Sequence, residues 1–240
     1  MSKDNILEID HLQVFYRKGK NKKQVLHDIN FQMKRGEILG LVGESGCGKT
    51  TLSKTILGLI PDKEGKILLD TKHPQMIFQD PYSSLNPSKR IGWLMEEPLR
   101  HFTNLSKDER REKVIQMLVK IGLGEEYYNR RPSELSGGQR QRVSIGMALL
   151  AGSEFVIADE PVSALDVTIQ AQIMELLKEL QKEYHISMLF ISHDLRVIYQ
   201  MCDRLLVMKA GEIVEQGEVD EVFRNPTHPY TKQLLKSFLS

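Results

Sequence analysis

Apolar residues in the first sixty positions are grouped into short runs with the two-residue period of β-strands. Residues 6–14 and 25–33 carry mixed apolar and polar alternation on either side of a basic, glycine-containing loop. The segment 37–42 is almost entirely apolar and leads directly into glycines, which is typical of a buried strand. A helix is predicted over 50–59 and is stopped by Pro61. A strand, a glycine-rich turn and a helix in this order predict a parallel α/β unit.

The middle of the chain changes to the period of an amphipathic helix. Val114, Leu118 and Ile121 fall on one face of a helix predicted over 107–122, and charged residues occupy the opposite face. Three strand-like runs follow, at 155–158, 188–191 and 205–208. A further helix is predicted between the first two of these runs. Strands that alternate with helices predict a parallel sheet covered on both faces, with a helical subdomain of about 85–150 inserted into it.

Composition and charge argue against a nucleic-acid-binding protein, a membrane-spanning protein and a secreted protein. The chain has 240 residues with 33 Lys and Arg against 32 Asp and Glu, so no global basic field points to nucleic acid. The basic run 17–23 is interpreted as a solvated loop. No apolar run reaches the roughly 20 residues of a membrane span, and the first residues lack the apolar core of a signal peptide. The two cysteines, Cys47 and Cys202, fit a reducing compartment, so we expect a cytoplasmic chain.

The segment 43–50 matches the phosphate-loop pattern G-x-x-x-x-G-K-T. Glycines allow backbone N–H groups to close around phosphate oxygens, and the following helix presents its positive N-terminus to the same anion. Lys49 can reach the β- and γ-phosphates, and Thr50 can ligate Mg²⁺. Cys47 is interpreted as a small residue of the loop, in preference to a redox role. The residues expected to hold the nucleotide here are Gly43, Ser45, Gly46, Cys47, Gly48, Lys49, Thr50 and Thr51.

Two acids follow the strand-like run 155–158. Asp159 would stand at the carboxyl end of a buried strand, where an acid can hold magnesium directly or through water. Glu160 is one residue further, where its carboxylate can take up the proton of a water that attacks the γ-phosphate. The alternative is a pair of solvated turn acids, and the phosphate loop upstream argues against it.

Two further motifs, one between the phosphate loop and the acid pair and one after the acid pair, give the chain a characteristic order of motifs. The segment 135–139 reads Leu-Ser-Gly-Gly-Gln, between the phosphate loop and the acid pair, and Ser-His-Asp follows at 192–194. Alone, Ser-Gly-Gly would be an ordinary helix cap. In this order the motifs resemble the nucleotide-binding subunit of an ATP-binding cassette (ABC) transporter, over nearly the whole chain. The resemblance implies an α/β fold: a RecA-like P-loop NTPase core with an antiparallel β-subdomain and an inserted helical subdomain, 1–240 being one nucleotide-binding domain.

The resemblance also implies roles for residues outside the phosphate loop. The signature residues that would contact the γ-phosphate of ATP held by the partner subunit are Ser136, Gly137, Gly138 and Gln139. Gln79 would touch the magnesium and the attacking water, and His193 would contact the γ-phosphate. Asp166 would lie in the loop that crosses the dimer interface. Tyr16 is the choice for stacking on adenine, and Phe15 remains open because the strand register could favour it.

Two stretches, 78–87 and 225–231, resemble the peptide and nickel importer branch of the family, and 97–101 leans toward its nickel-uptake members. The chain departs from that branch in a short connection at 69–75. It also has Gly-Met-Ala at 146–148, where the family has alanine-arginine-alanine. The function implied is the ATP-hydrolysing subunit of an importer for peptides, nickel or a metal chelate, working with ATP and Mg²⁺.

The implied partners are a second nucleotide-binding subunit, identical or a sister, two transmembrane permease subunits and, through the complex, an extracytoplasmic solute-binding protein. The chain would be peripheral, on the cytoplasmic face of the membrane, and would dock through 79–87 with Tyr82 and Leu85 as apolar anchors. One alternative is a soluble ABC ATPase acting on ribosomes or DNA, although neither a second cassette nor a long coiled coil occurs in the sequence. Another is a regulatory module without turnover, against which Glu160 and His193 argue.

Overall fold

The computed structural model describes residues 2–18, 21–80 and 85–239. The chain forms two compact units: Met1–Thr71 together with His185–Ser240, and the continuous segment Lys72–Tyr184. Among the described residues, no helix has both the length and the apolar character required to cross a membrane.

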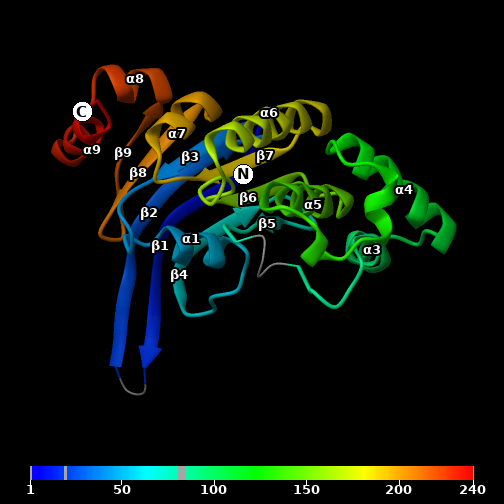
Figure 1. Cartoon of the computed structure of the whole chain (residues 1–240). Helices are drawn as coiled ribbons and strands as arrows, with labels where there is room; N and C mark the ends of the chain where they lie inside the picture. The colour runs from blue at the N-terminus through cyan, green and yellow to red at the C-terminus, as the bar shows by residue number, and fades with distance from the viewer. Residues whose placement is uncertain (1, 19–20, 81–84, 240) are drawn as a thin grey trace. The chain divides into compact units, whose positions relative to one another are not determined.

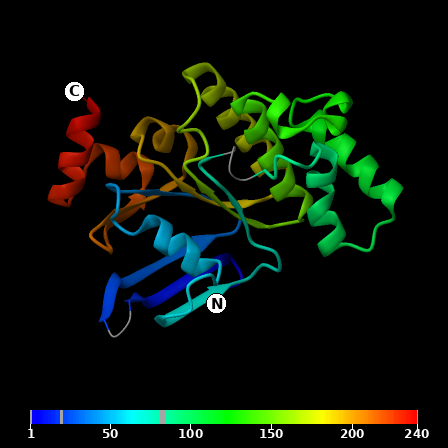
Figure 2. The same ribbon diagram turned by 60° about the horizontal axis from the view of Figure 1, so that its bottom comes forward.

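The first unit contains an antiparallel sheet in the order β2-β1-β4. Its strands are β1 (Asn5–Lys18), β2 (Asn21–Lys34) and β4 (Lys63–Leu69). Leu7, Leu12 and Val14 of β1 are fully buried, in keeping with a strand that has one face on the core. The helix α1 (Lys49–Ile56) packs beside β2 and β4 (Figure 2). The expected antiparallel β-subdomain is confirmed.

The same unit also contains strands in the order β7-β3-β8-β9. They are β3 (Ile38–Val42), β7 (Ser187–Ile191), β8 (Arg204–Lys209) and β9 (Glu212–Glu218). β3 is parallel to both β7 and β8, whereas β8 and β9 are antiparallel. Every residue of β3 and β7 is buried, as expected of parallel strands covered on both faces. The helices that follow are α7 (Leu195–Met201), α8 (Val219–Arg224) and α9 (Pro229–Leu239); α7 packs on β3, α8 and α9 (Figure 1).

The second unit is mainly helical. Its helices are α3 (Ile91–Phe102), α4 (Lys107–Lys120), the short 3₁₀ helices η1 (Glu125–Asn129) and η2 (Pro132–Glu134), α5 (Gly137–Leu150) and α6 (Val167–Tyr184). β5 (Gln75–Ile77) pairs in parallel with β6 (Phe155–Asp159). Gly146 lets α5 approach α3 and α4, because a Cβ there would lie 2.9 Å from Met95 Cε and 3.2 Å from Met117 Cγ. The expected helical insertion between two strands is confirmed.

Candidate functional site

The glycine-rich loop 43–50 connects the buried strand β3 to helix α1, the setting that the sequence predicted. Cys47 N donates to the Glu44 carbonyl at 3.2 Å, which closes the turn. The Lys49 ammonium folds back over the loop and donates to the carbonyl oxygens of Gly43 at 2.6 Å and Glu44 at 3.0 Å. The lysine charge is therefore held at the mouth of a turn whose next element is a helix N-terminus, an arrangement suited to an anion.

Glycine is required in this loop for two different reasons. At Gly43 a Cβ would lie 2.2 Å from the Met208 carbonyl oxygen, and at Gly48 it would lie 2.7 Å from Leu26 Cδ2. At Gly46 a Cβ would meet nothing within 4 Å, but φ is +80°, a conformation that glycine adopts most readily. The loop thus forms a cradle packed tightly on its protein side, while Gly46 supplies only the backbone conformation.

Tyr16 and Phe15 both line a shallow pocket, together with Leu59 and Pro61, which follow α1. The two rings differ in what covers them. Lys22 Nζ stands 3.5 Å from the centroid of the Phe15 ring. Tyr16 is 45% exposed, and its hydroxyl lies 3.5 Å from Thr51 Oγ1 on α1. An exposed ring next to the loop helix favours Tyr16 for stacking on a base.

The acid pair lies at the carboxyl end of β6, as expected. Glu160 has φ +49°, the left-handed conformation that is uncommon for a residue other than glycine. Its carbonyl accepts hydrogen bonds from Ser163 N at 3.3 Å and Ser163 Oγ at 3.1 Å, which hold the following turn. Non-glycine residues in this conformation cost free energy and occur often at functional sites, which agrees with the role expected of Glu160.

Gln79 and the acid pair follow two neighbouring strands that pair with each other. β5 is parallel to β6, with Ile77 opposite Ala158. Gln79 follows Ile77 by two residues, and Glu160 follows Ala158 by two residues. Both side chains therefore leave the carboxyl ends of neighbouring parallel strands, the edge at which α/β sheets bind ligands. His193 holds the equivalent position after β7 in the first unit, where the Ser192 and Asp194 side chains fix the turn into α7.

The signature segment begins helix α5. Ser136 Oγ accepts from Gln139 N at 3.3 Å, and Gln139 Oε1 accepts from Ser136 N at 2.9 Å, a reciprocal capping box. At Gly138 a Cβ would lie 2.5 Å from Ile169 Cγ2 on α6, so this glycine is set by packing. Asp166 Oδ1 in turn accepts from Ile169 N at 3.0 Å at the start of α6. The predicted helix N-terminus at Ser136 is confirmed.

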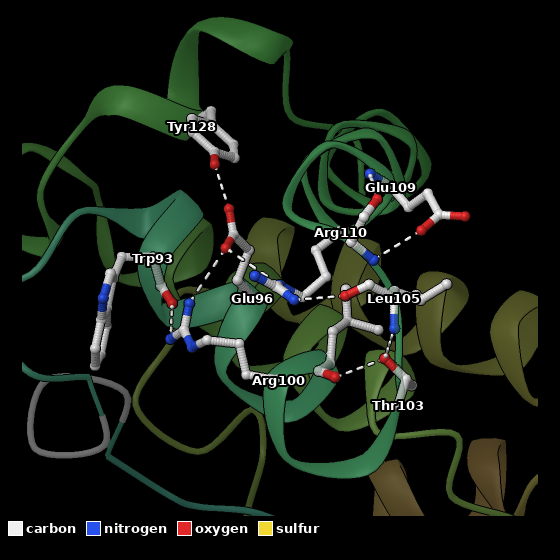
Figure 3. A network of polar contacts seen from close by, with 10 residues as sticks. Trp93, Glu96, Arg100, Thr103, Leu105, Glu109, Arg110 and Tyr128 are labelled. Carbon is white, nitrogen blue, oxygen red and sulfur yellow. Dashed lines mark hydrogen bonds and ion pairs between the residues drawn. The ribbon is translucent and has the colours of Figure 1, made fainter.

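A buried carboxylate, that of Glu96, connects α3, α4 and η1 (Figure 3). Glu96 of α3 is 7% exposed and accepts a short hydrogen bond from the Tyr128 hydroxyl. Its Oε2 also lies 3.2 Å from Arg100 Nη1 and 3.8 Å from Arg110 Nε. Burial raises the pKa of Tyr128 to about 12, and the hydrogen bond to Glu96 adds to this shift.

Tyr127, next to Tyr128 in η1, accepts a 2.8 Å hydrogen bond from Gln139 Nε2. η1 is therefore bonded to α3 through Tyr128 and to the signature segment through Tyr127. Neither tyrosine was singled out from the sequence, because a pair of adjacent aromatics gives no signal of which polar groups it will meet.

Replacing Glu96 with alanine is expected to destabilise this unit by about 3 kcal/mol, because it leaves the Arg100 and Arg110 guanidinium groups facing an apolar side chain. The value is at the low end for a broken buried pair, since the two arginine side chains keep 27% and 20% exposure. Denaturant unfolding measures the loss. Glu97→Ala on the same helix is the control; equal losses for both variants would contradict the role given to the Glu96 network.

The docking segment 79–87 is only partly described. Tyr82 lies outside the described residues. Leu85 is 2% exposed, so the expectation that it is an apolar anchor on the surface is wrong: its side chain is already covered within the chain. Phe78, before Gln79, is 50% exposed.

A phosphate loop between β3 and α1, acids after β6 and a capped glycine-rich helix start define a P-loop ATPase. The chain belongs to the ABC transporter family: the family described as ABC transporter matches residues 26–163. A second family, Oligopeptide/dipeptide transporter, C-terminal region, matches residues 214–240.

Relatives and solved structures agree with the family. The oligopeptide transport ATP-binding protein OppF of Bacillus subtilis is 43% identical, over 98% of this chain and 82% of its own. The dipeptide transport ATP-binding protein DppF of Escherichia coli is 44% identical, over 89% and 69% respectively. The structure of cbiO1 from Clostridium perfringens, part of the transporter complex cbiONQ, is 31% identical with a TM-score of 0.82, covering 93% of this chain and 92% of that one.

A second solved structure is an ATP-binding cassette dimer in a post-hydrolysis state with ADP and Pi. It is 27% identical with a TM-score of 0.78, covering 89% of this chain and 98% of that chain. The α/β P-loop NTPase fold expected from the sequence is confirmed, and the chain is an ATP-binding ATPase of the ABC transporter family. The alternative of a soluble ABC ATPase acting on ribosomes or DNA is not favoured.

Proposed function

We propose that this chain is the ATP-hydrolysing subunit of an importer for oligopeptides or dipeptides. The observation that carries the proposal is the match of residues 214–240 to the C-terminal region of oligopeptide and dipeptide transporters, beyond the cassette match at 26–163. OppF and DppF, the relatives reported above, are named for the same two classes of solute. Peptides are therefore preferred to nickel or a metal chelate.

The residues of the site fit ATP with Mg²⁺. The cradle formed by Gly43 and Gly48 leaves room only for a ligand on its open side, and Lys49 supplies a cation there. Thr50, Gln79 and Asp159 offer the oxygen ligands that Mg²⁺ prefers. When bound, the ion would neutralise charge on the phosphates. The remaining residues proposed to hold the nucleotide are Tyr16, Ser45, Gly46, Cys47 and Thr51.

Hydrolysis would then depend on groups aimed at the γ-phosphate. Glu160 takes the proton of the attacking water, Gln79 orients that water and His193 contacts the phosphate. The signature residues 136–139 serve the ATP held by a second cassette, with Asp166 at the interface. The N-terminus of α5, which Ser136 caps, suits this contact with an anion.

In this proposal 1–240 acts as one nucleotide-binding domain. Its partners are a second cassette, identical or a sister, two permease subunits and a solute-binding protein reached through the complex. Closure of the cassette pair on ATP would drive the permease, and hydrolysis would reset it. The chain would be held at the cytoplasmic face of the membrane by the permease.

Uptake by the assembled transporter tests this function. The chain is coexpressed with its permease and binding-protein partners, and uptake of labelled dipeptides, longer peptides and Ni²⁺ is measured. We expect ATP-dependent peptide uptake that is lost with Lys49→Ala in this chain. Uptake of Ni²⁺ without peptide uptake would overturn the solute class, and sedimentation with ribosomes in place of membranes would overturn the transporter role.

A further inference from the structure

The C-terminal segment contacts the phosphate loop directly. Tyr230 lies in the first turn of α9, follows Pro229 and is 4% exposed. Its hydroxyl accepts a hydrogen bond from the backbone N–H of Glu44, with 3.1 Å between nitrogen and oxygen. Glu44 is the second residue of the loop, and the two partners are 186 positions apart in the chain. Figure 1 shows α8 and α9 following β9 in the first unit.

Glu44 is the residue on which the loop closes. Its carbonyl accepts from Cys47 N at 3.2 Å and from Lys49 Nζ at 3.0 Å. A hydrogen bond to its N–H therefore fixes the residue that orients both the turn and the lysine ammonium. Fixing a binding loop before its ligand arrives increases affinity, because less conformational entropy is lost on binding.

The Tyr230 ring is itself held in place. Lys209 Nζ, at the end of β8, lies 4.8 Å from the centroid of the ring. The next turn of the chain supports the loop as well, because Gly211 N donates to the Cys47 carbonyl at 2.8 Å. Burial raises the pKa of the Tyr230 hydroxyl, so it stays protonated at neutral pH.

A half-buried carboxylate on β9, that of Glu215, fixes the start of α9. Glu215 accepts from Thr227 N at 2.7 Å, Thr227 Oγ1 at 2.9 Å and His228 N at 3.0 Å. Burial alone would raise the pKa of Glu215, but the hydrogen bonds from Thr227 and His228 lower it. Pro229 suits the first position of the helix because its φ is already fixed. The position of Tyr230 is thus determined by the sheet of the first unit.

We propose that Tyr230 is a positioning residue for the phosphate loop, so that the C-terminal segment sets the affinity of this subunit for ATP. The inference rests on the proposed binding of ATP by residues 43–50. It gives a role to the segment 225–231, which the sequence connected with the importer branch without any chemistry of its own.

The test compares Tyr230→Phe with Tyr199→Phe. Both variants remove one hydroxyl from the first unit and keep the ring; the Tyr199 hydroxyl lies 2.9 Å from Asp220 Oδ1, in a contact between α7 and α8. In Tyr230→Phe we expect faster hydrogen exchange of the Glu44 amide in the nucleotide-free chain. We also expect the Kd for ATP with Mg²⁺, measured by calorimetry, to rise by about 2–12-fold, the worth of one hydrogen bond.

Tyr199→Phe should leave both the hydrogen exchange of the Glu44 amide and the Kd for ATP unchanged, because the Tyr199 hydroxyl contacts Asp220 and not the loop. Unchanged Glu44 exchange and Kd in Tyr230→Phe, or equal effects of Tyr199→Phe, would overturn the proposal. A wild-type chain that does not bind ATP would overturn the proposed role of the loop instead. If the melting temperature shows that Tyr230→Phe folds poorly, Glu215→Gln is the second variant, because it weakens the hydrogen bonds that fix the start of α9. Unchanged hydrogen exchange of the Glu44 amide in Glu215→Gln would also overturn the proposal.

Discussion

Glu160→Gln is expected to slow ATP hydrolysis by about 10²–10⁴-fold while ATP binding is retained. Glutamine keeps the size of the side chain but cannot accept the proton of the attacking water. The left-handed backbone at Glu160 and the two hydrogen bonds from Ser163 do not depend on the carboxylate, so the local fold should persist. Phosphate release measures turnover, and size-exclusion chromatography in ATP should show an accumulated dimer.

The control is Glu154→Gln, which neutralises an exposed acid just before β6 and should leave turnover unchanged. Turnover close to wild type in Glu160→Gln would mean that another group activates the water. Loss of ATP binding in that variant would mean that the carboxylate acts in binding, and the assignment of a general base would be withdrawn.

Ser136→Arg is expected to abolish hydrolysis and to inhibit wild-type chains mixed with it, if the chain pairs with itself. Each site would combine one chain's phosphate loop with the other chain's signature segment, and a bulky cation at Ser136 blocks that segment. In an equal mixture about half of all randomly formed dimers contain one chain of each kind. Each mixed dimer keeps one intact site. If hydrolysis requires both sites of a dimer, the mixed dimers are inactive and activity should fall to about a quarter of wild type, below the half expected from dilution alone. Wild-type specific activity should also rise with concentration.

Ser106→Arg is the matched control, because Ser106 caps α4 with the same kind of capping box and costs the same helix-cap energy, about 1 kcal/mol. It should not inhibit wild-type chains. Activity that is independent of concentration and unaffected by Ser136→Arg would exclude a composite site. A chain that is inactive alone but active with a sister cassette would exclude only the homodimer.

The elements with a clear period were predictable from the sequence. Three elements match their expected positions: the strands around 38–42 and 187–191 and the helix over 107–120. A strand buried on both faces is apolar throughout, and a helix buried along one stripe has apolar residues at helical spacing, so both can be identified from the residue pattern. The helix α3 was not identified. Gly92 and Pro98 interrupt its pattern, although Gly92 is there to make room for the Tyr128 ring, 2.5 Å from where a Cβ would lie.

The motifs of the site could be predicted from the sequence, but the hydrogen bonds that hold these motifs in place could not. The phosphate loop, the acid pair and the signature cap depend on local geometry, which short patterns specify. The bonds of Glu96 with Tyr128 and of Tyr230 with Glu44 connect residues far apart in the chain, and no local rule pairs them. Leu85 was wrongly expected on the surface for a similar reason: one apolar residue in a turn-rich segment does not reveal what covers it.

The discontinuous first unit also affects how a new chain acquires its function during synthesis. Ile38 of β3 pairs with Met188, and the other neighbour of β3 is β8, so both partner strands are made long after β3 itself. Until then β3 is an apolar strand with two open edges, the kind of segment that aggregates or engages chaperones. The second unit is one continuous segment, Lys72–Tyr184, and can fold earlier. The nascent chain therefore completes its nucleotide loop only after residues 204–230 have emerged from the ribosome.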